Sequence, residues 1–65
     1  MGQTYHITIE REGYAPFYFG GFNGRKTILT NRTMAKHYLR VSDVAKASEK
    51  LALMYPKSKV IVHND

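Results

Sequence analysis

The fold is decided by the stretch FYFGGFNGRKTILT, residues 17–30, which predicts a β-hairpin. Its first half is rich in aromatic residues, which fit the pleated, half-buried surface of a strand. Asn23-Gly24 is a strong short-range hairpin signal, because both residues tolerate the positive φ angles that a type I′ turn requires. A returning strand is therefore expected at about residues 25–30, with Ile28 or Leu29 directed inward.

Alternation along a strand assigns the aromatic side chains to two faces. Phe17 and Phe19 are predicted to face the core, and Tyr18 and Phe22 the opposite side. No charged residue occurs from residue 13 to residue 24. An uncharged aromatic segment in a thin domain suggests a contact surface for a partner or a second copy of the chain. The candidate interface aromatics are Tyr14, Tyr18 and Phe22, with scattered surface aromatics as the alternative interpretation.

Strands are also predicted at the two ends of the chain. Residues 4–10 alternate strictly, with Tyr5, Ile7 and Ile9 on one side, which is typical of a half-buried strand. Residues 59–63 carry a second run of β-branched residues. We expect these two strands to pair, which would make His6 and His63 cross-strand neighbours.

Helical spacing begins after residue 30. Thr30 or Asn31 is expected to cap a short helix that starts near Arg32, and Ser42 to cap a longer helix that Pro56 ends. The apolar positions Met34, Ala35, Tyr38 and Leu39 would share one face of the first helix, and Val44, Ala47, Leu51, Met54 and Tyr55 one face of the second. The predicted fold is a single small α+β domain, residues 1–65. It has three or four antiparallel strands in the order β-β-β-α-α-β, with the helices packed on one face.

Positive charge is concentrated in one part of the chain. Ten lysines and arginines against five acids give a net charge of +5. Five of the basic residues lie in a stretch without an acid: Arg25, Lys26, Arg32, Lys36 and Arg40. The other five are matched in number by the five acids. On a helix, Arg32, Lys36 and Arg40 would form a single row, and nothing in the stretch would offset their mutual repulsion.

Three interpretations of this basic stretch remain open at the level of sequence. A run of charge is often a solvated face that keeps a protein soluble. The same residues could contact the phosphates of DNA or RNA. They could equally dock on an acidic protein surface or on a nucleoprotein.

The composition restricts chemistry and compartment. The chain has no cysteine, no signal-like N-terminus and no apolar run long enough to cross a membrane, so the cytoplasm is the expected location and no membrane partner is expected. His6, His37 and His63 share no metal-ligand spacing, and two histidines without a carboxylate make a poor zinc site. We therefore predict no catalytic residues, no cofactor and no metal.

The order of features resembles the small accessory proteins that bacteriophages encode. The shared features are an opening strand (residues 5–9), a glycine-rich aromatic hairpin (residues 18–24), a Thr30-Asn31 step into a short helix, and a second helix opening at Ser42. The second helix opens with Asp43-Val44-Ala45, where an acidic-alanine pair is more usual. The resemblance, which is one of layout, implies a non-enzymatic, anti-CRISPR-like inhibitor that binds a host nucleic-acid-handling complex.

Overall fold

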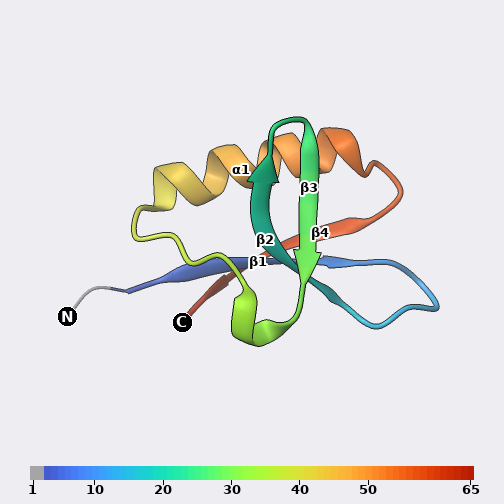
Figure 1. Ribbon diagram of the computed structural model, residues 1–65, viewed down its shortest axis with the longest axis horizontal. Helices are drawn as coiled ribbons and strands as arrows, with labels where there is room; N and C mark the ends of the chain where they lie inside the picture. The colour runs from blue at the N-terminus through green and yellow to red at the C-terminus, as the bar shows by residue number, and fades with distance from the viewer. Residues whose placement is uncertain (1–2) are drawn as a thin grey trace.

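The computed structural model describes residues 3–65 as an antiparallel sheet with one α-helix across one face (Figure 1). The elements are β1 (Tyr5–Glu10), β2 (Phe17–Asn23), β3 (Lys26–Thr30), the 3-10 turn η1 (Arg32–Met34), α1 (Val41–Met54) and β4 (Lys59–Asn64). The four strands lie in the order β3-β2-β1-β4. The predicted α+β fold class is confirmed, with one α-helix in place of the two expected.

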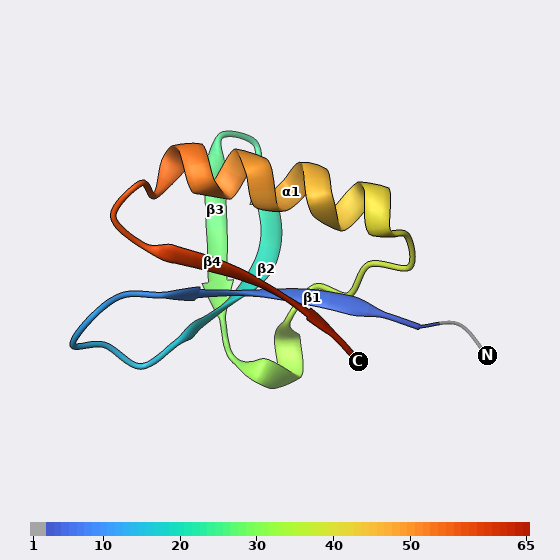
Figure 2. The ribbon, with the colours of Figure 1, turned by 180° about the vertical axis from the view of Figure 1, so that it is seen from behind.

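The terminal strands form the most regular part of the sheet. β1 and β4 pair along their whole length, from Tyr5 opposite Asn64 to Glu10 opposite Lys59. His6 lies opposite His63, as expected. The pairing places the C-terminus beside the first strand, and Figure 2 shows α1 lying along this half of the sheet.

The core lies between this half of the sheet and α1. Its members are Ile7 and Ile9 of β1, Phe19 of β2, and Val44, Ala47 and Leu51 of α1. The helix residues are three of the five predicted for its apolar face, spaced at three and four positions. The helix ends at Met54, two residues before Pro56, as expected. Its N-cap is Arg40, so the prediction that Ser42 caps this helix is wrong.

A β-bulge in β2 changes the face of the sheet on which Phe22 lies. Phe19 pairs with Leu29 and Phe22 with Thr27, so β2 contains one residue more than β3 over the same span. Gly21 has a φ of +111°, a backbone conformation that L side chains rarely adopt. The extra residue turns Phe22 to the side of Phe19, and their rings lie edge to face with centroids 4.8 Å apart. The prediction that Phe22 faces the outer side is therefore wrong.

The hairpin turn lies one residue later than predicted. Asn23 pairs with Lys26, so the two central residues are Gly24 and Arg25. Gly24 has a φ of +64°, and no non-glycine residue in the range 3–65 has a positive φ. A glycine at the first central position alone is the pattern of a type II′ turn, and the predicted type I′ turn at Asn23-Gly24 is wrong.

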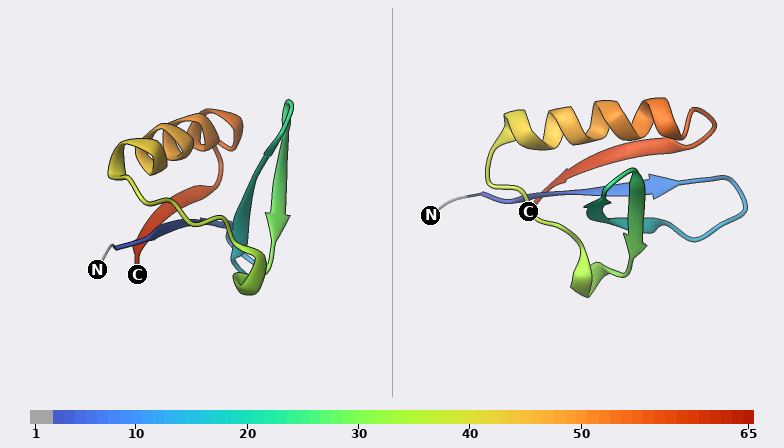
Figure 3. Two further views of the ribbon diagram at one scale, coloured as in Figure 1. Left: turned by 60° about the vertical axis from the view of Figure 1, so that its left-hand side comes forward. Right: turned by 45° about the horizontal axis from the view of Figure 1, so that its top comes forward.

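The outer part of the hairpin extends beyond the cover of α1, as Figure 3 shows in its left view. Ile28 and Leu29 remain 42% and 41% exposed, so the prediction that one of them points into the core is wrong. Phe17, at the other end of β2, is also 42% exposed, whereas Phe19 is fully buried. The core therefore contains only one of the two phenylalanines assigned to it.

Residues 31–40 do not form the expected first helix. Asn31 does cap a turn, since its side chain accepts a hydrogen bond from the Met34 N–H at 3.0 Å. The turn is only η1. Residues 35–40, which we call the extended segment, contain no helix: Ala35 and Arg40 have extended backbone angles, and Leu39 forms a bend. The backbone of this segment instead bonds to the sheet: Lys36 N–H donates to the Phe19 carbonyl, and Tyr38 exchanges two hydrogen bonds with Tyr5.

Candidate functional site

The five residues of the basic stretch do not lie in one row. Arg25 and Lys26 are at the tip of the β2–β3 hairpin, whereas Arg32 is in η1 beyond the other end of β3 (Figure 1). A five-residue strand is about 15 Å long, so these groups are well separated. Because residues 35–40 contain no helix, Arg32, Lys36 and Arg40 also lack the helical spacing that would align them. The predicted row Arg32-Lys36-Arg40 is therefore wrong.

A different set of basic residues comes together beside α1. Lys36, Arg40 and Lys46 line a hollow of about 500 Å³ between residues 36–40 and the first half of the helix. Lys50, one helical turn after Lys46, has its Nζ 4.3 Å from the centre of the Phe22 ring. We call Lys36, Arg40, Lys46 and Lys50 the basic groove. Lys36 and Arg40 belong to the acid-free basic stretch of the sequence, whereas Lys46 and Lys50 are among the five other basic residues, which the acids match in number.

The charges of the basic groove are not neutralised by ion pairs. Across residues 3–65, no lysine or arginine nitrogen lies within 4.0 Å of a carboxylate oxygen; the ion pairs found there both join a histidine to Asp65. One acid, Asp43, lines the same hollow. Lys36 and Lys50 instead lie over the rings of Tyr38 and Phe22. The hollow thus presents three cations and one acid to a partner, and Lys50 extends the positive charge by one helical turn.

The three candidate interface aromatics do not form one surface. Tyr14 is 64% exposed in the β1–β2 loop, where the Arg11 guanidinium lies over its ring. Tyr18 is half-buried on the face opposite α1 and stacks on His6, with ring centroids 5.8 Å apart. Phe22 packs against the core on the helix side. A contact through Tyr14 or Tyr18 stays a prediction, and it cannot include Phe22 on the same face.

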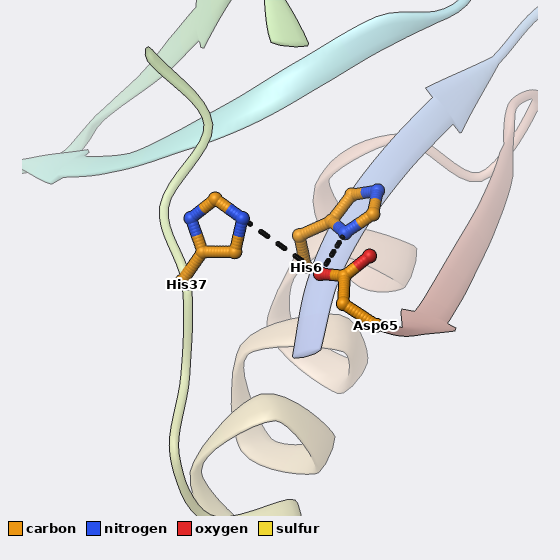
Figure 4. Close-up of side chains that lie close together, drawn as sticks. All are labelled: His6, His37 and Asp65. Carbon is orange, nitrogen blue, oxygen red and sulfur yellow. Dashed lines mark hydrogen bonds and ion pairs between the residues drawn. The ribbon is translucent and has the colours of Figure 1, made fainter. Parts of the chain in front are cut away.

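A cluster of histidines forms where β1, β4 and the extended segment meet. His6 Nδ1 donates a hydrogen bond to Asp65 Oδ2 at 2.7 Å, and His37 Nε2 lies 3.7 Å from the same oxygen. Figure 4 shows the Asp65 carboxylate beside both rings. His63 stacks on His6 with centroids 4.7 Å apart. We call His6, His37 and Asp65 the histidine–aspartate cluster.

Sequence reasoning found only part of this cluster. The expected pairing of the terminal strands placed His6 beside His63, and the same register brings Asp65 next to Thr4, whose carbonyl accepts the Asp65 N–H at 2.8 Å. The pairing of the terminal strands therefore already places Asp65 close to His6. His37 could not be placed, because it was assigned to a helix that does not form.

The electrostatic environment of two groups in this region differs from that in water. The hydrogen bond from His6, together with the nearby imidazoles of His37 and His63, lowers the pKa of Asp65 below its usual value. Asp65 is thus ionised over the physiological pH range. Burial, with a smaller effect of the Asp43 charge, raises the pKa of Tyr38.

The hydrogen bonds of the histidines do not join into a catalytic relay. The Thr8 hydroxyl is bonded to His63 Nε2 at 2.7 Å, whereas the carboxylate of Asp65 is bonded to His6. A nucleophilic triad needs the hydroxyl and the carboxylate on the same imidazole. Thr8 is also buried. That the protein is not an enzyme stays a prediction, and this arrangement offers no hydroxyl nucleophile for one.

Comparison with protein-family models, with curated proteins and with solved structures found no match to this chain. Within residues 3–65, no helix has both the length and the apolar character needed to cross a bilayer.

Proposed function

We propose that this protein is a non-enzymatic binding domain that contacts the phosphates of a nucleic acid, within a host nucleic-acid-handling complex, through the basic groove. The observation that carries the proposal is the convergence of Lys36, Arg40 and Lys46 on one hollow, with Lys50 one helical turn further along α1. Within residues 3–65, none of the four forms an ion pair with a carboxylate. Bringing like charges together is unfavourable, and an anionic partner would reverse the sign of that contribution.

Phosphates fit this surface because they are closely and regularly spaced anions. Lys46 and Lys50 lie one turn apart on α1, and Lys36 and Arg40 face the same hollow from the extended segment. Contacts of this kind position a protein on a nucleic acid and do not depend on base sequence. The resemblance in layout to phage accessory proteins supports a host complex in the cytoplasm as the place of action.

The proposal is tested by titrating labelled duplex and single-stranded DNA with the protein at several salt concentrations. If the four basic groups each neutralise one phosphate, the log–log slope of affinity against salt on duplex DNA is about −3.6. The charge reversals Lys46→Glu and Lys50→Glu, made together, should abolish most of this binding.

The matched control is the pair Arg11→Glu and Lys57→Glu, which changes the net charge by the same amount outside the basic groove. Equal loss of binding in the two double variants would show a non-specific effect of net charge. It would overturn the proposal that the basic groove is the phosphate-binding surface. If the parent protein binds no DNA at low salt, the phosphate proposal is wrong. A pull-down from host lysate that loses a protein partner only with the groove variant would then identify an acidic protein surface as the target.

A further inference from the structure

We infer that the histidine–aspartate cluster is a binding site for a divalent transition-metal ion of the zinc class. Its ligands would be His6, His37 and the carboxylate of Asp65. One nitrogen from each ring and one carboxylate oxygen lie within 4.8 Å of one another. Imidazole and carboxylate are ligands that Zn²⁺ commonly uses in proteins. His37 also lines the hollow of the basic groove, but the site uses none of the four groove cations, and the inference does not depend on the proposed function.

Backbone hydrogen bonds position the three ligands from both sides of β1. His6 lies in β1 itself, and Tyr5, its neighbour, exchanges hydrogen bonds of 2.8 and 2.9 Å with Tyr38, the neighbour of His37. On the other side, Asp65 N–H donates to the Thr4 carbonyl at 2.8 Å. The ligands therefore come from three segments, each tied to the same short length of backbone. The three ligand side chains are therefore held near one another before a metal binds.

The distances between the ligand atoms are close to those of a tetrahedral zinc site. Bonds of about 2.0–2.2 Å to zinc place neighbouring ligand atoms about 3.4 Å apart. Here Asp65 Oδ2 is 2.7 Å from His6 Nδ1 and 3.7 Å from His37 Nε2. Side-chain movements on the order of 1 Å would bring all three atoms to this spacing. His37 and Asp65 are exposed, so their rotation meets little resistance.

The residues around the three ligands restrict the rotation of His6 and leave room for a fourth ligand. The His6 ring is stacked between Tyr18 and His63, which restricts its rotation, as the partners that orient a metal ligand commonly do. A hollow of about 300 Å³ adjoins the three ligands, so a water molecule has room at a fourth position. Arg32 lines this hollow too, but none of its nitrogens is within 4.0 Å of the Asp65 carboxylate in the part of the chain that the structure describes.

The test is a calorimetric titration of tag-free protein with Zn²⁺, followed by NMR of the imidazole nitrogens. The parent protein should bind one equivalent, with His6 and His37 signals shifting. His37→Gln and Asp65→Asn should each weaken binding by about tenfold or more, since removing even a partner that orients a ligand costs about 10- to 100-fold. Both residues are exposed, so each variant should keep its fold, which circular dichroism checks.

His63→Gln is the matched control, because His63 lies in the same cluster of rings and is not one of the three ligands. Its zinc affinity should fall by clearly less than that of His37→Gln, because His63 restricts the rotation of the His6 ring but supplies no ligand atom. The inference is overturned if the parent binds no more tightly than the double variant His37→Gln/Asp65→Asn. It is also overturned if His63→Gln weakens binding as much as His37→Gln, or if Asp65→Asn leaves it unchanged. The groove variant Lys46→Glu/Lys50→Glu should keep full zinc affinity, which separates this result from the proposed function.

Discussion

The β1–β4 pair and residues 31–40 are both held to the sheet by backbone hydrogen bonds, yet only the first could be predicted. The residues of β1 and β4 show the local patterns that are typical of strands, and the two strands pair as those patterns led us to expect. Residues 31–40 carry a helical pattern of apolar residues, but the extended chain bonds to Phe19 and Tyr5. The difference shows that a periodic pattern of nine or ten residues is weak evidence for a helix, because an isolated helix of that length is marginal in water.

The largest effect should come from breaking the core that both regions depend on. Phe19→Ala should lower the free energy of unfolding by about 3–5 kcal/mol, because the side chain is fully buried and its removal leaves a cavity. For a domain of this size that loss should leave much of the protein unfolded. Phe17→Ala, in the same strand but 42% exposed, is the control and should cost clearly less. Urea denaturation measures both, and equal losses would contradict the assignment of Phe19 alone to the core.

The bulge is the next place to test, because it decides which side of β2 Phe22 faces. Gly21→Ala should destabilise the protein by about 1–3 kcal/mol, since a φ of +111° strains any residue with a Cβ. Gly13→Ala is the comparison, because Gly13 lies in the exposed β1–β2 loop, where a Cβ would meet no atom within 4 Å and the backbone can relax around its φ of +86°. Thermal unfolding of the two variants should therefore show the larger decrease in melting temperature for Gly21→Ala. The opposite order would contradict the bulge geometry.

The features that could be predicted from the sequence are those set by local periodicity, and the features that could not are set by contacts between distant segments. The strands, the core face of α1 and the neighbouring positions of His6 and His63 follow from periods of two or of three and four in the sequence. The bulge at Gly21 cannot be predicted from these periods, because an extra residue in β2 is recognisable only once the register of β2 against β3 is known. For the same reason Phe22 was assigned to the wrong face. The basic groove takes Lys36 and Arg40 from residues 36–40, and the histidine–aspartate cluster takes His37. Neither could be assembled while that segment was expected to be a helix.

A smaller effect is expected from the cap of η1. Asn31→Ala should reduce the free energy of unfolding by about 1 kcal/mol, because the Met34 N–H loses its side-chain acceptor. Thr33→Ala, in the same turn and exposed, should have little effect. If chemical denaturation finds the two variants equally stable, the capping bond does not contribute to the start of the extended segment.

The most direct measure of residues 35–40 changes no residue and should show the smallest difference in free energy. In the extended segment only alternate amides bond to the sheet: Lys36 and Tyr38 donate to Phe19 and Tyr5. For His37 and Leu39 the structure, within residues 3–65, shows no backbone acceptor. Native-state hydrogen exchange should therefore find Lys36 and Tyr38 slow and His37 and Leu39 fast, since exchange follows local opening. A helix would instead protect consecutive amides from Lys36 onward. Protection of all four amides would restore the helical row of Arg32, Lys36 and Arg40, and it would remove the geometry on which the basic groove and the position of His37 depend.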